Sequence, residues 1–343
     1  MRSFEKYLLA LVAVSLLGLP PRGWSQEPVP GTFTTIDFPG AAGTVVPPST
    51  AININVERQI VGDYFLDPVG MVHGFLLSQG NFTTIDFPGS IFTELDDITP
   101  EGAIMGTYVD GTNFGVHIFV LSKGSFTTID FPGAVQTFGN STNPKGDIVG
   151  GYFDTSGNVH GLLVSQDTLT TIDFPEAIGT FLFGINPEGE IVGGYLDAAF
   201  ADHGFLLRKG SFSTIDFPGA VGTVAEGIDA KGDIVGAHQS PDGTLHGFLL
   251  SKRSFRTIDF PGAVMTFAEG IDPQGDIVGG YQNPDGTFHG LLLSDGGVAS
   301  ESAAPAMPGQ TTESPKVVLP YNVRKLLQRR LPLGRFGAGL MRP

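Results

Sequence analysis

Short runs of apolar and β-branched residues recur along the chain, separated by turns rich in Gly and Pro. One complete unit has strand candidates at Met265–Asp272, Asp276–Tyr281 and His289–Ser294, with Pro-Gln-Gly and Asn-Pro-Asp-Gly turns between them. A fourth type of strand, as in Phe255–Phe260, ends in Pro-Gly, which suits a type II turn. In one copy Glu176 replaces that glycine, so we expect its turn to differ. Four strands in about 43 residues predict one blade of a β-propeller.

The unit recurs six times in a constant register. The hexapeptide Thr-Ile-Asp-Phe-Pro-Gly and its variants supply one aspartate per copy, at Asp37, Asp86, Asp130, Asp173, Asp216 and Asp259. A second motif supplies one histidine per copy, at His73, His117, His160, His203, His246 and His289. Catalysis needs a single constellation, whereas these residues appear once in every copy. We therefore interpret both columns as structural, with buried His and Asp side chains that bond turn backbone or each other.

The two ends of the repeat array complement each other. The first copy begins with only its fourth strand, Phe33–Phe38, and the last copy ends after its third, His289–Ser294. The orphan first strand can complete the unfinished last sheet and leave no open edge at the seam. The sequence thus predicts an all-β, six-bladed β-propeller of four-stranded antiparallel blades over residues 31–296. The variable strand ending in Gly-Ile-Asn or Gly-Ile-Asp is expected to lie innermost.

The repeated motifs, read in order, are His-Gly-Phe-Leu-Leu-Ser-x-Gly, Thr-Ile-Asp-Phe-Pro-Gly and Gly-Ile-Asn-x-x-Gly-x-Ile-Val-Gly. They resemble the HAF repeat of bacterial extracellular proteins, whose usual core is His-Ala-Phe-Leu. The resemblance covers Phe33 to Ser294, and the chain departs from it by placing Gly after the His. It implies an extracellular setting and a propeller-like fold, related in layout to kelch and WD-repeat propellers, and no established reaction.

The segments outside the array predict export. Arg2 and Lys6 precede an apolar stretch from Tyr7 to Leu19, followed by small residues at the positions required for a cut after Ser25. Residues 1–25 are therefore interpreted as a signal peptide, and the protein as secreted or periplasmic. Residues 297–315 have the composition of a flexible linker. Residues 316–343 form a basic tail that is either disordered or a short amphipathic helix.

Charge and composition exclude several classes of binding partner and of catalytic site. The chain has no cysteine, which excludes disulfides and thiolate sites. Between residues 31 and 294 there are 9 Lys and Arg against 30 Asp and Glu, a net charge of 9 − 30 = −21. Such a surface should repel nucleic acid and anionic membranes. No segment suits a transmembrane anchor, and we expect a monomer. The chain also lacks the esterase elbow, metalloprotease, phosphate-loop and dinucleotide motifs.

The residues that break the repeat are the better candidates for ligand binding. The innermost strand is the most variable, and one position of it reads Ile52, Asp96, Asn140, Phe183, Glu226 and Glu269. Its four polar members could form an oxygen-rich ring around the central channel, and such a ring suits Ca²⁺. The alternative is a solvated acidic channel mouth, since the usual calcium-loop spacing is absent. No metal ligand is assigned, and no cofactor other than this Ca²⁺ is expected.

His238 is a second departure. Five copies have Tyr at the end of the Gly-Gly strand, and the fifth copy has His238, which is either a tolerated surface substitution or a ligand-binding residue. The leading functional hypothesis is a non-enzymatic binding or scaffold module outside the cytoplasm, presenting loops to a glycan or protein ligand. The alternative is a hydrolase or lyase sited in the channel, with or without a requirement for Ca²⁺. The fold alone does not decide between them.

Overall fold

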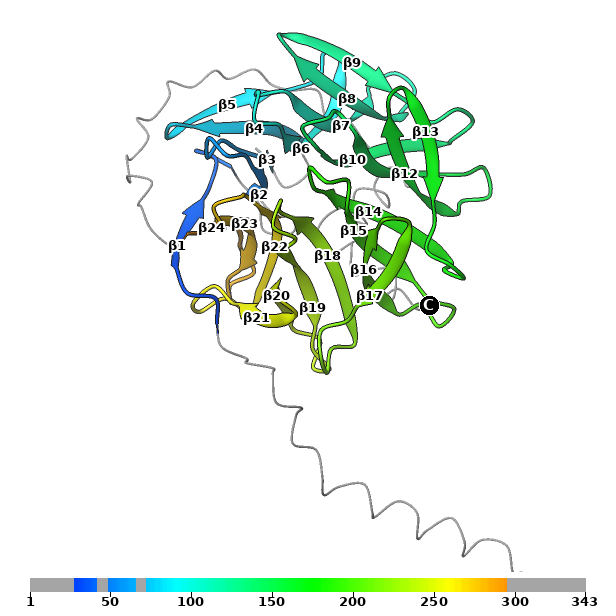
Figure 1. Ribbon diagram of the computed structural model, residues 1–343. Helices are drawn as coiled ribbons and strands as arrows, with labels where there is room; N and C mark the ends of the chain where they lie inside the picture. The colour runs from blue at the N-terminus through cyan, green and yellow to red at the C-terminus, as the bar shows by residue number, and fades with distance from the viewer. Residues whose placement is uncertain (1–27, 42–48, 66–71, 295–343) are drawn as a thin grey trace, which may run out of the picture.

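The computed structural model describes residues 28–41, 49–65 and 72–294; the predicted signal peptide, linker and basic tail lie outside these ranges. Six four-stranded antiparallel sheets are arranged as blades around a central axis (Figure 1). The predicted six-bladed propeller is confirmed. Among the described residues no helix is long and apolar enough to cross a bilayer.

Each blade runs from an innermost to an outermost strand in sequence order. The innermost strands are β2 (Ser49–Ile54), β6 (Ser90–Ile98), β10 (Gln136–Thr142), β14 (Gly179–Ile185), β18 (Gly222–Ile228) and β22 (Met265–Ile271). The second strands are β3 (Ile60–Phe65), β7 (Ile104–Asp110), β11 (Ile148–Phe153), β15 (Ile191–Leu196), β19 (Ile234–Gln239) and β23 (Ile277–Gln282). The third strands are β4 (Val72–Ser78), β8 (Val116–Ser122), β12 (Val159–Ser165), β16 (Asp202–Arg208), β20 (Leu245–Ser251) and β24 (Phe288–Ser294). The outermost strands are β5 (Asn81–Ile85), β9 (Ser125–Ile129), β13 (Thr168–Ile172), β17 (Ser211–Ile215), β21 (Ser254–Ile258) and β1 (Thr32–Ile36). Blades 1 to 6 are numbered by their innermost strands, β2 to β22.

The ring closes as the complementary ends predicted. Strand β1 pairs antiparallel with β24, in a register from Thr32 opposite Ser294 to Ile36 opposite Gly290. The Tyr281 hydroxyl bonds the Thr35 hydroxyl at 2.9 Å across this seam, as equivalent tyrosines do within other blades. The seam therefore reproduces the contacts of a continuous blade and leaves no unpaired inner edge.

The core lies between neighbouring blades. The Phe that lies two residues after the repeat histidine is fully buried in four blades, as Phe75, Phe119, Phe205 and Phe248. Glycine in the second strand has a steric cause, because a Cβ on Gly150 or Gly193 would collide with the carbonyl oxygen of Phe138 or Phe181 on the adjacent innermost strand. The Gly-Gly pair of the repeat thus lets the second strand approach the first where the first bulges.

The turn at Glu176 contradicts the expectation that it differs. Glu176 has a φ of 63°, in the left-handed region that its glycine counterparts Gly133 and Gly219 occupy at 81° and 80°. The blade keeps its turn because the flanking strands are paired as in the other copies. A non-glycine residue at this φ is strained by roughly 1 kcal/mol.

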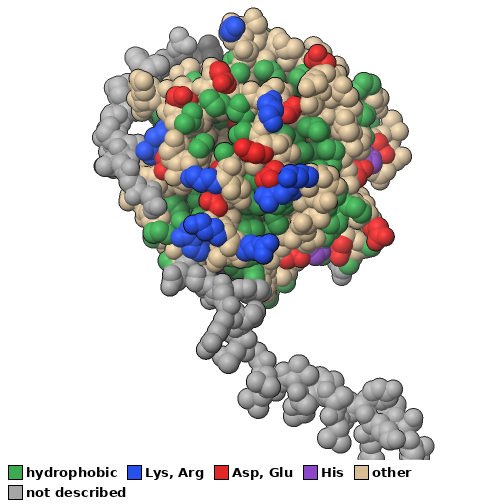
Figure 2. All heavy atoms as spheres, in the orientation of Figure 1, with side chains coloured by type: hydrophobic (Ala, Val, Ile, Leu, Met, Phe, Trp, Pro, Cys, Tyr) green, Lys and Arg blue, Asp and Glu red, His purple; other side chains and the backbone are tan. Residues whose placement is uncertain are grey.

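The expected negative charge is partly offset on one face of the ring. Figure 2 shows Lys and Arg side chains scattered among acidic side chains on that face. Arg58 pairs with Asp276 at 3.0 Å, and this ion pair joins two loops that follow innermost strands. Arg208, at the end of β16, pairs with Glu190 in the loop that follows β14, at 2.6 Å. The histidines of the repeat belong to the other end of the blades, where the third strands begin.

Candidate functional site

Each blade carries one His–Asp hydrogen bond between the start of its third strand and the end of its outermost strand. We call these six contacts the rim pairs. The Nδ1-to-carboxylate distances lie between 2.7 and 2.9 Å for His73–Asp86, His117–Asp130, His160–Asp173, His203–Asp216, His246–Asp259 and His289–Asp37. The last pair spans the seam between β24 and β1. The repeated His and Asp residues therefore bond each other, which is one of the two arrangements expected from the sequence.

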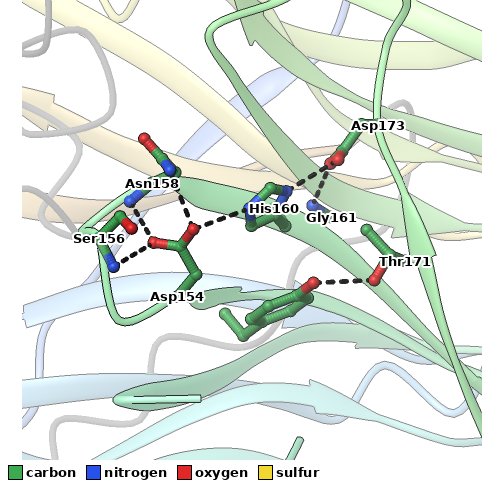
Figure 3. A network of polar contacts seen from close by, with 8 residues as sticks. Asp154, Ser156, Asn158, His160, Gly161, Thr171 and Asp173 are labelled. Carbon is green, nitrogen blue, oxygen red and sulfur yellow. Dashed lines mark hydrogen bonds and ion pairs between the residues drawn. The ribbon is translucent and has the colours of Figure 1, made fainter. Parts of the chain in front are cut away.

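The rim pairs are not buried, contrary to expectation. The histidine side chains are 21–28% exposed and the aspartate side chains 37–50% exposed. Strand twist carries the ends of the outer strands to the periphery, where water reaches them. In blade 3, Asp173 also accepts the Gly161 amide at 3.2 Å, so it joins two strands while part of its carboxylate faces solvent (Figure 3).

A second carboxylate lies beside several rim histidines. In blade 3 the Asp154 carboxylate is 3.6 Å from His160 Nε2 (Figure 3). In blade 4 the Asp197 carboxylate lies at the same distance from His203 Nε2. Burial alone would lower the pKa of His160, but its bonds to Asp173 and Asp154 raise that pKa above its ordinary value. The rim thus presents repeated Asp–His–Asp clusters that are accessible to hydrogen-bond donors.

An aromatic stack ties each rim pair to the preceding blade. Tyr152 stacks on Phe131 of blade 2 with ring centroids 3.9 Å apart and planes 5° apart. Its other side faces His160 at 5.1 Å, and its hydroxyl bonds the Thr171 hydroxyl at 2.8 Å. The equivalent Phe–Tyr stacks are Phe38–Tyr64, Phe87–Tyr108, Phe174–Tyr195 and Phe260–Tyr281. This contact explains why the Phe of Asp-Phe-Pro-Gly repeats.

His238 takes the place of the tyrosine in blade 5. It is only 4% exposed, so it is not a surface substitution. Its ring stacks on Phe217 at 3.6 Å and lies 5.3 Å from the His246 ring. Its Nδ1 is buried without a hydrogen-bond partner. Burial, and then the charge of His246, lower the pKa of His238 to about 4, so it is neutral at pH 7.

The six variable residues of the innermost strands meet at the axis. Each occupies the bulge of its strand, as the register shifts around Asp96, Asn140 and Glu226 illustrate. A bulge leaves its residue out of the ladder and bends the strand, which here turns these side chains to the centre. Asp96, Asn140 and Glu226, together with the equivalent residues Ile52, Phe183 and Glu269, line one cavity of about 40 Å³. A cavity of that size holds a few water molecules at most.

Polar contacts already engage part of this central ring. The Thr107 hydroxyl donates to Asp96 Oδ2 at 3.0 Å, and the Asn140 amide donates to the Leu182 carbonyl at 2.7 Å. Asp96, Glu226 and Glu269 are all less than 9% exposed, so the group is not a solvated channel mouth. Within residues 28–41, 49–65 and 72–294, no group of three or more His, Asp or Glu side chains is placed to hold a metal ion.

Asp97, next to the ring, was missed by the sequence reasoning. Its carboxylate accepts bonds from the Ser141 hydroxyl at 2.8 Å and the Thr142 amide at 2.6 Å, and so joins blade 2 to blade 3. Burial raises the pKa of Asp97 to about 6, although these donors act in the opposite direction. The equivalent residues in blades 4 to 6 are glycines: Gly184, Gly227 and Gly270.

A ring of Asn and Asp residues follows the innermost strands and links neighbouring blades. In blade 4 the Asn186 amide donates to the Asp229 carbonyl of blade 5 at 3.3 Å. Blades 5 and 6 have Asp229 and Asp272 instead, and in each the Oδ2 atom is buried without a hydrogen bond. Burial, followed by the nearby Asp276 carboxylate, raises the pKa of Asp272. The junctions that follow blades 5 and 6 therefore lack the side-chain amide with which Asn186 bonds the next blade.

Asp202 was also missed by the sequence reasoning, because it lies outside the repeated His and Asp columns. It opens β16 beside His203, where the other blades have an apolar residue: Val72, Val116, Val159, Leu245 and Phe288. Aligning the third strands would have revealed this acid in an apolar column. Asp202 lines an open groove between blades 4 and 5 with His203, Asp216 and the turn from Phe217 to Thr223.

No protein-family model and no curated protein matches the chain. Solved structures that match include a fucose-specific lectin from Aleuria aurantia, with 16% identity, a TM-score of 0.48, and coverage of 74% of this chain and 96% of the lectin. TolB from Acinetobacter baumannii matches with 15% identity, a TM-score of 0.47, and coverage of 73% and 64%. The β-propeller domain of the Trilobed protease from Pyrococcus furiosus matches with 10% identity, a TM-score of 0.46, and coverage of 75% and 99%. Similarity at this level carries no information on ligand or activity.

Proposed function

We propose that the chain is an extracytoplasmic, non-enzymatic binding module that presents its rim to a glycan. The observation that supports this proposal is the repetition of six partly exposed rim pairs at equivalent positions of the ring. Carboxylates are hydrogen-bond acceptors, and sugar hydroxyls are donors that match them. Export and the relationship to HAF repeats are parts of the same proposal, and they rest on the sequence motifs.

Repetition suits a ligand that is itself repetitive. A single exposed Asp–His pair offers few contacts, so one rim site should bind one sugar weakly. Six equivalent sites on a rigid ring can engage several residues of one polysaccharide, and the second contact then profits from a high effective concentration. The proposal therefore predicts avidity for polymers and little affinity for isolated sugars.

The alternative enzyme would act in the central channel. The cavity there measures about 40 Å³, whereas sites for small organic molecules usually occupy about 300–1,000 Å³. A sugar ring would not fit without moving the innermost strands. The buried carboxylates Asp96, Glu226 and Glu269 therefore do not favour a channel-sited hydrolase or lyase.

The test is a binding screen of the secreted chain against envelope polysaccharides and their oligosaccharides, with and without Ca²⁺. The variants replace Asp with Asn at one, two or four rim positions, beginning with Asp130 and Asp173. Asn is chosen because its amide oxygen can still accept a hydrogen bond from the histidine. We expect affinity for polymer to fall stepwise with the number of replacements while the melting temperature changes little. The matched control is Glu188→Gln, an exposed acid away from the rim. Undiminished binding by the fourfold variant, or binding only to a protein, would contradict the proposal.

A further inference from the structure

The groove between blades 4 and 5 is a site of its own. Its volume is about 330 Å³, which lies within the range of small-molecule sites. It is lined by Asp202 and His203 at the start of β16 and by the segment from Asp216 to Thr223, which includes Pro218 and Val221. Val221 is 54% exposed, which is high for a large apolar side chain. Acidic and apolar side chains thus line the same small opening.

Two residues that coincide at this junction make the groove hollow. At the corresponding junction of blades 1 and 2, Val72 and Phe92 pack in one buried cluster. At the junction of blades 5 and 6, Leu245 packs in a cluster with Met265. At the junction of blades 4 and 5 the equivalent residues are Asp202 and Gly222. A short acid and a residue without a side chain replace two apolar side chains, and the space they leave stays open.

The Asp202 carboxyl has no hydrogen-bond donor among the described residues. Burial raises the pKa of Asp202 to about 7, with the positive charge of His203 lowering it and the Asp197 carboxylate raising it. The other charged group facing it is Asp216, which already bonds His203 at 2.9 Å. His238, which lies behind Phe217, is buried and neutral at pH 7. Asp197, Asp202 and Asp216 outnumber the one nearby histidine, so the local charge is negative, and no described side chain donates a hydrogen bond to Asp202.

We propose that this groove binds a compact molecule carrying a primary ammonium group, of the size of an amino sugar, with Asp202 as the partner of the ammonium. Asp202 would accept its hydrogen bonds, and Asp216 would contribute a second acceptor. Pro218 and Val221 would cover the apolar face of the ligand. The site occurs once in the ring, because Asp202 and Gly222 occur together only at this junction. It shares His203 and Asp216 with one rim pair, but it occurs once, whereas the proposed function of the rim requires six equivalent sites.

Binding should displace a proton. A carboxyl with a pKa of about 7 is half protonated at pH 7. An ammonium group lowers that pKa, so each bound amine should release on the order of half a proton at pH 7. The apparent affinity should rise between pH 6 and pH 8, as Asp202 ionises. A neutral sugar would show neither effect, and this difference separates an ionic site from a hydroxyl-binding one.

The experiment is isothermal titration of the secreted chain in two buffers of different ionisation enthalpy. The probes are glucosamine, its neutral analogues glucose and N-acetylglucosamine, and Nα-acetyl-lysine amide. We expect one site per chain for glucosamine, with proton release, and no saturable binding of the neutral sugars. The lysine derivative distinguishes a sugar-borne amine from a protein side chain. Equal binding of glucose and glucosamine, a stoichiometry near six, or no amine binding would each overturn the inference.

Variants separate the charge from the shape of the groove. Asp202→Asn keeps the size and should weaken glucosamine binding roughly tenfold or more, with loss of proton release. Gly222→Met fills the groove as Met265 does one blade later, and should also abolish binding. Asp202→Val restores the apolar residue that the other blades have at this position. It should lose glucosamine binding while keeping unchanged or higher stability, so that unfolding is excluded as the cause of the lost binding. The control Asp242→Asn removes an exposed acid from blade 5 and should leave binding unchanged. Retained binding by both Asp202→Asn and Gly222→Met would refute the site.

Discussion

The rim and the centre of this propeller use the same repeat in opposite ways. At the rim, six copies of one Phe–Tyr–His–Asp arrangement recur with almost constant distances, and a single tyrosine is replaced. At the centre, no more than two of the six bulge residues are alike: Ile52, Asp96, Asn140, Phe183, Glu226 and Glu269. Every blade has both positions, so the difference in sequence variation arises from where in the blade each position lies.

Distance from the axis explains the contrast. Rim residues of different blades lie far apart, so each blade can carry the same charged pair without repulsion between copies. Bulge residues converge on one cavity of about 40 Å³, where six identical carboxylates would be buried together. Burying like charges side by side is costly, and large side chains would overfill the space. The centre therefore favours a mixture of apolar, amide and acidic residues.

The largest expected effect comes from breaking a rim stack. Tyr152→Ala removes the contact with Phe131 and the bond to Thr171, and should lower the free energy of unfolding by about 3 kcal/mol. Thr171→Val removes only the hydrogen bond and should cost about 1 kcal/mol. Urea unfolding followed by fluorescence or circular dichroism measures both. Equal losses in the two variants would show that the stack itself contributes little.

The one irregular rim position can be made regular. His238→Tyr should stabilise the fold by about 2 kcal/mol at pH 7, because it removes a buried nitrogen without a partner and offers a hydroxyl to Thr257. The pKa of folded His238 is about 4, below its unfolded value, so its neutral form contributes stability above pH 6.5. That stability is lost as the pH falls to 4, and the advantage of tyrosine should grow over this window. Thermal melts from pH 4 to pH 8 test it; a difference independent of pH would contradict this account.

A smaller effect is expected where innermost strands meet the next blade. Asp272→Asn supplies the amide donor that Asn186 uses in blade 4, and should stabilise by about 1 kcal/mol above neutral pH. The pKa of folded Asp272 is raised, so wild-type stability increases as the pH falls through it, and the gain from Asn should shrink in acid. The reciprocal control, Asn186→Asp, should destabilise by a similar amount at pH 8. Chemical denaturation at pH 5 and pH 8 measures these differences, and a change of the same sign in both variants would exclude the interpretation.

The smallest effect is expected from calcium at the centre. Asp96 and Asn140 already bond Thr107 and Leu182, and the described residues offer no cluster of three acidic or histidine ligands. Millimolar Ca²⁺ should therefore leave the melting temperature unchanged. A calcium-dependent shift that Glu226→Gln removes would restore the oxygen-rich ring as a cation site. Mg²⁺ at equal ionic strength controls for a general salt effect.

The sequence predicted what repeats and missed what depends on contacts between different copies. The pairing of His160 with Asp173 follows from two columns of equal period, and closure at β1 follows from the truncated ends. The burial of His238 was missed, because Phe217 of the preceding blade covers it. The exposure of the rim pairs depends on the twist of the blades, which a linear pattern does not contain. Asp202 was detectable, since it breaks an apolar column.

Closure through β1 also imposes an order on biosynthesis. Thr32–Ile36 is among the first parts of the ring to leave the ribosome, and its partner, Phe288–Ser294, is the last. Until β24 has been made, this strand lacks its partner, and its free backbone groups can pair with other chains. The ring can therefore close only after more than 250 residues have been delivered, because β1 and β24 lie at opposite ends of the array.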